Sequence, residues 1–189
     1  MASLFKTTLN TRYLPTGDNR FIRSDCPLNI SDEEIAFLKE NNFLTIVDLR
    51  SEKEYTAKPC RLENDEDFNY LHMPVTGGMM PESPEQVVPG YLEMLDAQMD
   101  KIVDTITTAP SKVMFFCSAG KDRSGMVSLM ILRKLGIDEQ TIIDDYMASK
   151  DNLMDLLVKL ANQYKDLFLE TMVPDVKNVK RVLEELKNR

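Results

Sequence analysis

The chain has 189 residues, of which 43% are hydrophobic, and its formal net charge is −8. This length fits one domain with a single large core, and the apolar content is ordinary for a globular protein. The negative charge argues against nucleic-acid binding, which needs a basic face, and no apolar run is long enough to span a bilayer. We therefore expect a single domain over residues 1–189, with residues 1–20 as an N-terminal arm, no nucleic-acid partner and no membrane insertion.

The first residues of the chain lack the apolar core of a signal peptide. The three cysteines are odd in number and have no metal-type spacing, which agrees with a reducing compartment. These features predict a cytoplasmic protein that needs neither a metal nor a cofactor. The oligomeric state stays open.

Strands and helices alternate along the chain. In chain order, the predicted elements are a strand at 21–23, a helix at 32–41, strands at 43–49 and 69–73, a loop at 77–89, a helix at 88–108 that is broken near Pro89 and Gly90, a strand at 112–117, and helices at 126–135, 139–150, 151–168 and 174–188. Ser31 followed by Glu34 forms a capping box. The run 43–49 is almost continuously apolar, as in a buried parallel strand. In the loop, Met79 and Met80 are expected to be exposed or folded over the site.

This alternation predicts an α/β fold with a central, mostly parallel sheet and helices on both faces. In such sheets, ligand sites gather at the carboxyl ends of the strands. The strand that ends at Cys117 is therefore the first place to look for chemistry.

Cys117 and Arg123 are separated by five residues, between an apolar strand and a helix. Successive amides of such a loop can point at one oxyanion, and the helix N-terminus adds partial positive charge. The same field stabilises a thiolate at Cys117. The planar guanidinium of Arg123 can hold two phosphate oxygens at once.

The segment reads Cys117-Ser118-Ala119-Gly120-Lys121-Asp122-Arg123-Ser124-Gly125. It resembles the cysteine-dependent protein tyrosine phosphatase superfamily, and more closely the bacterial tyrosine phosphatase-like family whose loop reads Cys-x-x-Gly-Lys-Asp-Arg-Thr-Gly. Blocks at 20–25, 46–51 and 142–149 also look like those of this family. One position departs from the superfamily pattern, because Phe116 stands where a His usually precedes the Cys.

The resemblance implies that Cys117 is the nucleophile and that Ser124 donates a hydrogen bond to its thiolate. The phosphate-binding residues would be Ser118, Ala119, Gly120, Lys121, Asp122 and Arg123. The reaction also needs an acid for the leaving group. Asp48 is the first candidate, because it ends a predicted strand and because the family assigns this role to the Asp of its Asp-Leu-Arg block. The alternatives are that Asp48 is a structural carboxylate paired with Arg50 or Arg23, and that Asp122 is the acid.

The sequence thus predicts a phosphomonoester hydrolase that works through a phosphocysteine intermediate. Its partners would be a phosphorylated protein, with phosphotyrosine as first choice, or a phosphoinositide or other small phosphate ester. A non-catalytic module that only binds phosphate is the alternative from a different class.

Overall fold

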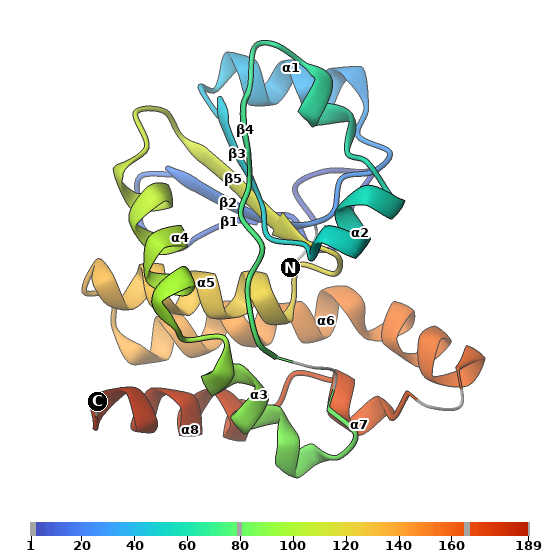
Figure 1. Cartoon of the computed structure of the whole chain (residues 1–189), viewed down its shortest axis with the longest axis vertical. Helices are drawn as coiled ribbons and strands as arrows, with labels where there is room; N and C mark the ends of the chain where they lie inside the picture. The colour runs from blue at the N-terminus through green and yellow to red at the C-terminus, as the bar shows by residue number, and fades with distance from the viewer. Residues whose placement is uncertain (1–2, 79–80, 165–166, 189) are drawn as a thin grey trace.

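A five-stranded sheet lies between two layers of helices in the computed structural model, which describes residues 3–78, 81–164 and 167–188 (Figure 1). The strands are β1 (Arg12–Tyr13), β2 (Phe21–Asp25), β3 (Thr45–Asp48), β4 (Asn69–His72) and β5 (Val113–Cys117). Their order is β1-β2-β5-β3-β4, and every neighbouring pair is parallel except β1 with β2. The predicted α/β class with a mostly parallel sheet is confirmed. The short antiparallel strand β1, within the N-terminal arm, was not predicted.

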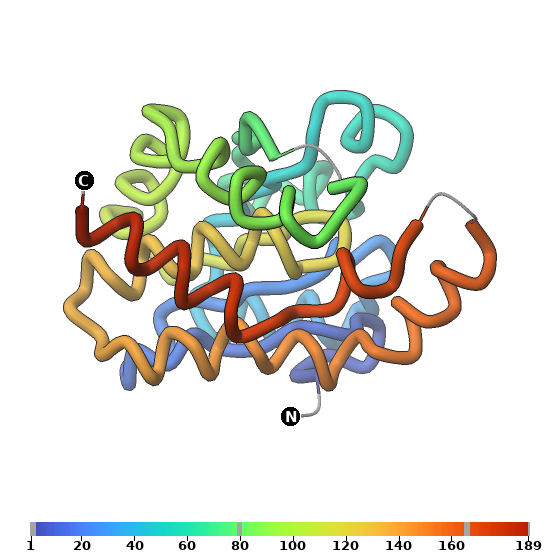
Figure 2. Tube along the Cα trace, turned by 90° about the horizontal axis from the view of Figure 1, so that it is seen from below, coloured from blue at the N-terminus to red at the C-terminus, as the bar shows by residue number. Residues whose placement is uncertain are grey.

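Helices cover both faces of the sheet. They are α1 (Asp32–Glu40), α2 (Glu52–Ala57), α3 (Val87–Glu93), α4 (Ala97–Thr108), α5 (Asp122–Lys134), α6 (Glu139–Gln163), α7 (Leu169–Met172) and α8 (Val176–Lys187), with 3-10 turns at Arg61–Asn64 and Pro84–Gln86. In Figure 1, α1 and α2 lie on one side of the sheet and α4, α5 and α6 on the other. Figure 2 shows α8 alongside α6, and α8 also packs against α3. In the described ranges, no helix has both the length and the apolar character to cross a membrane.

Side chains of the buried strands alternate between two apolar cores, as the period of two in a strand requires. On β5, Phe115 and Cys117 belong to the core beneath α5, whereas Met114 and Phe116 belong to the core beneath α1. Asp48 is the register partner of Phe116. The Asp48 and Cys117 side chains therefore leave the sheet on opposite faces.

Two capping boxes begin the helices on the α1 side. The predicted box of Ser31 and Glu34 is confirmed at the start of α1. A second box, of Ser51 and Glu54, begins α2, a helix that was not predicted. Helix α2 brings the Glu54 carboxylate to Ser118 and Arg123, at the carboxyl end of β5.

Several helix boundaries differ from prediction, among them those in the segments 88–108 and 139–168. The break in the segment 88–108 lies after Glu93, because Asp96 caps α4 by accepting a hydrogen bond from the Met99 amide at 2.9 Å. Pro89 sits in the first turn of α3, where its missing amide donor costs nothing. The predicted helices 139–150 and 151–168 correspond to one helix, α6, which no Gly or Pro interrupts and which ends at Gln163, before the predicted end at residue 168. The prediction for Met79 and Met80 lies outside the described residues.

Candidate active site

The loop of residues 118–121, which we call the phosphate loop after its predicted role, joins β5 to α5 at the carboxyl end of the sheet. The helix begins at Asp122, four residues earlier than the predicted start at Met126, so Arg123 lies in its first turn. Gly120 has φ +64°, and a Cβ there would lie 2.4 Å from the Asp25 amide nitrogen. Only glycine combines that backbone conformation with so close an approach to β2.

The loop carbonyls are held by donors outside the loop. The Asn10 side-chain amide donates to the carbonyls of Gly120 (2.9 Å) and Ala119 (3.3 Å). The Arg23 guanidinium donates to those of Gly120 (2.8 Å) and Lys121 (3.2 Å), and the Cys26 amide donates to that of Ser118 (3.2 Å). None of the described peptide bonds is cis, so each amide points away from the carbonyl of its own peptide unit. The amides of residues 119–122 are therefore directed away from these donors, an arrangement that could serve as an anion cradle.

A buried ion network supports these donors. Asp145 of α6 accepts from Arg12 at 3.0 Å and from Arg23 at 2.5 Å. Burial alone would raise the pKa of Asp145, but the two arginines outweigh burial and lower it. Burial, followed by the charge of Arg23, lowers the pKa of Arg12 to about 10. Sequence reasoning missed this support, although an arginine directly after two apolar residues of a predicted strand, as Arg23 is after Phe21 and Ile22, can signal a buried partner.

Cys117 ends β5 and is only 2% exposed. Ser124, one residue after Arg123, is fully buried, and its hydroxyl oxygen has no hydrogen-bond partner within the described part of the chain. An unsatisfied buried hydroxyl is uncommon and calls for a reason. A thiolate or a bound oxyanion in the cradle would supply the missing acceptor.

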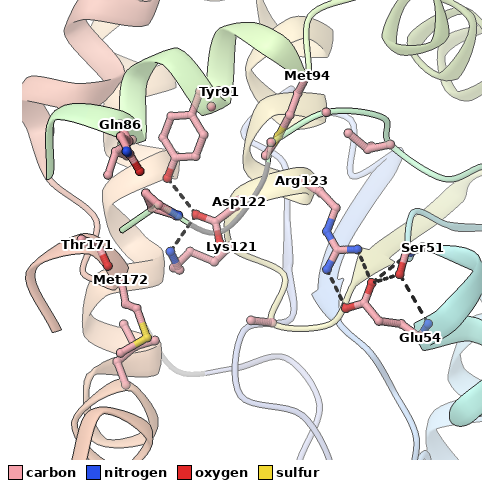
Figure 3. A pocket seen from close by; sticks show the side chains of 18 of the residues that line it. Ser51, Glu54, Gln86, Tyr91, Met94, Lys121, Asp122, Arg123, Thr171 and Met172 are labelled. Carbon is pink, nitrogen blue, oxygen red and sulfur yellow. Dashed lines mark hydrogen bonds and ion pairs between the residues drawn. The ribbon is translucent and has the colours of Figure 1, made fainter. Parts of the chain in front are cut away.

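Glu54 of α2 engages the guanidinium of Arg123 in a two-pronged ion pair (Figure 3). The distances are 2.5 Å from Nη1 to Oε2 and 2.9 Å from Nη2 to Oε1. The Ser118 hydroxyl donates to the same carboxylate. The hydrogen bond from Arg123 is the largest cause of the strongly lowered pKa of Glu54. Sequence reasoning missed Glu54, but the spacing of Ser51 and Glu54 in a capping box was available as a signal.

Asp48 does not approach the phosphate loop with its carboxylate. It is 0% exposed and accepts from Nε and Nη2 of Arg50 at 2.6–3.0 Å. The hydroxyl of Tyr70 donates to it as well, at 2.7 Å. This geometry matches the alternative in which Asp48 is a structural carboxylate paired with Arg50. Arg23, the other suggested partner, pairs with Asp145 instead.

Asp122 stands at the rim of a cavity in front of the loop. Its Oδ1 accepts from Lys121 at 2.7 Å and from Tyr91 at 2.8 Å (Figure 3). Its Oδ2 has no hydrogen bond within the described residues. Burial alone would raise the pKa of Asp122, but Lys121 and the hydrogen bond from Tyr91 outweigh it and lower that pKa.

The cavity has a volume of about 400 Å³. Of the residues that the sequence singled out, Ala119, Lys121, Asp122 and Arg123 line it. Cys117, Ser118, Gly120 and Ser124 belong to the same loop and first helical turn but do not line the cavity, and Asp48 lies on the other face of the sheet. Ser51 and Glu54 of the α2 region complete the wall beside Arg123.

A Cys-x5-Arg loop between a parallel strand and a helix, with its amides turned inward, has the form of the phosphate loop in cysteine-dependent phosphatases. The chain belongs to the tyrosine phosphatase family, whose family model matches residues 7–188. It is 32% identical over 74 residues to the triple specificity protein phosphatase PtpB of Mycobacterium tuberculosis, covering 39% of this chain and 27% of PtpB. It is 27% identical over 114 residues to a tyrosine-protein phosphatase of Nostoc commune, covering 54% of this chain and 39% of that protein. The matches therefore span less than half the length of either relative.

Solved structures agree on the fold. Kinase associated phosphatase, crystallised with its catalytic-site cysteine replaced by serine, superimposes with a TM-score of 0.52 at 14% identity, and 97% of each chain is covered. A human tyrosine phosphatase-like serine/threonine/tyrosine-interacting protein gives a TM-score of 0.50 at 13% identity, over 94% of this chain and 95% of the other. At these identities, the likeness concerns the fold alone.

Proposed function

We propose that this chain is a metal-independent phosphomonoester hydrolase of the protein tyrosine phosphatase type, with Cys117 as its nucleophile. The observation that carries the proposal is the set of four loop carbonyls, Ser118 to Lys121, held by donors outside the loop. Because each trans peptide directs its amide away from its carbonyl, these contacts support a loop whose amides of residues 119–122 face a bound phosphate. Such preorganised donors stabilise the charge that develops on a transferring phosphoryl group.

In the first step, the Cys117 sulfur attacks phosphorus, an S–P bond forms, and the bond to the leaving oxygen breaks. Arg123 and the loop amides hold the phosphoryl oxygens. The leaving oxygen takes a proton from an acid, and in the second step water cleaves the S–P bond and returns a proton to the same group. Ser124, whose buried hydroxyl lacks a partner in the described part of the chain, donates to the departing thiolate.

Asp122 is the acid in this proposal, in place of Asp48. Asp122 lines the cavity, and its Oδ2 has no hydrogen bond to any residue that the structure describes, whereas Asp48 is buried against Arg50 on the opposite face. The lowered pKa of Asp122 means that it is ionised at neutral pH in the free protein. A phosphate dianion that enters beside it raises this pKa by repulsion and so favours the protonated form.

The test compares Cys117→Ser with the matched control Cys26→Ser, which changes a cysteine that is not part of the loop. Both are assayed on an aryl phosphate, and phosphate or vanadate binding is measured by calorimetry. The proposal expects no turnover but retained anion binding for Cys117→Ser, and near wild-type turnover for Cys26→Ser.

A non-catalytic phosphate-binding module is the second candidate, favoured by the 2% exposure of Cys117. It predicts anion binding without turnover in the wild-type protein itself, so the same assay separates the two. The assignment of residues 1–189 to one catalytic domain and the cytoplasmic location stay predictions.

A further inference from the structure

The cavity extends beyond the residues that a phosphate group needs. On the side away from Arg123 and Glu54, it is bounded by α3, the end of α6, and α7. In Figure 3, Lys121 and Asp122 lie between Arg123 and Met172 of α7. The apolar side chains on this part of the wall are Val87, Tyr91, Met94, Leu157, Leu160 and Met172, which we call the apolar subsite.

The volume supports a second compartment. A cavity of about 400 Å³ lies in the range of pockets that bury a drug-sized ligand, which is much larger than one phosphate. An apolar wall contributes favourable binding free energy only when apolar surface of the ligand is removed from water against it. The group beside the phosphate is therefore expected to be apolar.

The charges of the wall lead to the same conclusion. Among the described residues, its charged side chains are Glu54, Lys121, Asp122 and Arg123, and they form two ion pairs, Arg123 with Glu54 and Lys121 with Asp122. The substrate phosphate takes Arg123 and the loop amides. Among the described residues, the cation of this wall that then remains is Lys121, so a second phosphate on the leaving group would have to displace Asp122 from Lys121 and would lie near the Asp122 carboxylate, which is unfavourable.

We propose that the apolar subsite binds an apolar side chain next to the phosphotyrosine of a phosphorylated protein. The inference rests on the proposed function and narrows its substrate class, against ligands with several phosphates. A phosphorylated lipid would also join one phosphate to apolar groups, but it lies in an anionic leaflet, and the net charge of −8 opposes approach to such a surface.

The test uses tyrosine-phosphorylated peptides that are identical except for the two residues flanking phosphotyrosine, which are Leu in one peptide and Ser in the other. For the wild-type protein, the kcat/KM of the Leu peptide should exceed that of the Ser peptide about tenfold, as for other apolar pockets. The difference should lie mainly in KM.

Leu160→Ser changes a partly exposed residue of the subsite. Val158→Ser is the matched control, since Val158 lies on the same helix, is 38% exposed, and does not line the cavity. We expect the Leu-to-Ser ratio to fall toward one in Leu160→Ser and to stay about tenfold in Val158→Ser. Because the measured quantity is a ratio within one preparation, partial misfolding of a variant does not affect it.

Three outcomes separate the ideas. If the wild-type protein turned over neither peptide, the proposed hydrolase function itself would be contradicted. Turnover of both peptides with a ratio near one, or a ratio that Leu160→Ser leaves unchanged, would overturn the subsite alone. A higher kcat/KM on vesicles that contain a monophosphorylated inositol lipid than on the Leu peptide would assign the subsite to a lipid instead.

Discussion

The ion pair between Glu54 and Arg123 leads to a prediction about how the Arg123 side chain is oriented for its proposed role in phosphate binding. A free arginine side chain samples many rotamers, and holding its fork in place before substrate arrives lowers the entropic cost of the transition state. Glu54 is held in turn by Ser51 and by the Ser118 hydroxyl. We therefore expect Glu54 to act as a positioning residue for Arg123.

Glu54→Gln is the sharpest perturbation, because Gln also completes a capping box and so preserves the start of α2. It removes the negative charge and leaves one acceptor oxygen where the carboxylate offers two. A hydrogen bond to a charged group contributes about 1.5–3 kcal/mol when buried, and an exposed ion pair about 0.2–1 kcal/mol. The side chains of the pair are partly exposed, at 21% for Arg123 and 36% for Glu54. We therefore expect the substitution to cost about 1–2 kcal/mol of transition-state stabilisation.

At about 1.4 kcal/mol for each tenfold change, this loss lowers kcat/KM by about 5- to 30-fold. The assay is steady-state hydrolysis of an aryl phosphate, with Glu52→Ala as control, since Glu52 is an exposed neighbour on the same helix. An equal or faster rate for Glu54→Gln would refute the reasoning. A faster rate in particular would show that Glu54 competes with phosphate for Arg123.

Three further predictions concern the site and its support. Arg123→Lys keeps a charge but loses the two-pronged fork, so kcat should fall by roughly 100-fold or more, and a near wild-type rate would show that charge alone suffices. If Asp122 is the acid, Asp122→Asn should slow esters of weakly acidic alcohols far more than those of acidic phenols and flatten the fall of their rate as pH rises, whereas Asp48→Asn should show neither effect. Asp145→Asn leaves two buried arginines poorly paired and should lower the free energy of unfolding at pH 7 by about 3–5 kcal/mol in urea denaturation. Because the folded-state pKa of Asp145 is lowered, that difference should be complete above pH about 4 and shrink below it, and a constant difference would contradict the assignment.

The phosphate loop could be predicted because its information is contiguous. Cys117, Gly120 and Arg123 lie within one short segment, and the apolar strand before it and the helix after it are visible in the same stretch. The buried strand β3 was equally clear from its apolar run. Neither prediction needed to know which distant segments are neighbours.

The role of Asp48 could not be predicted in the same way. A strand buried on both faces has no polar and apolar alternation, so its sequence does not show which face a given side chain takes. Only the register of β3 against β5, which pairs Asp48 with Phe116, places its carboxylate opposite Cys117. The end of a strand is thus a good guide to where a site lies and a poor guide to which side chain enters it.

The support of the loop is the least visible feature in the sequence, because it joins segments about a hundred residues apart. Asn10 lies in the N-terminal arm, which looked irregular, yet its amide reaches the carbonyls of Ala119 and Gly120. The backbone and side-chain carbonyl oxygens of Asn10 accept hydrogen bonds from Nη1 of Arg12. The Nε of Arg12 in turn donates to Asp145 of α6. The arm, β2 and α6 therefore meet beneath the loop, and together they set the direction in which its amides point. The anion cradle is a property of these three segments as much as of the nine residues that carry the motif.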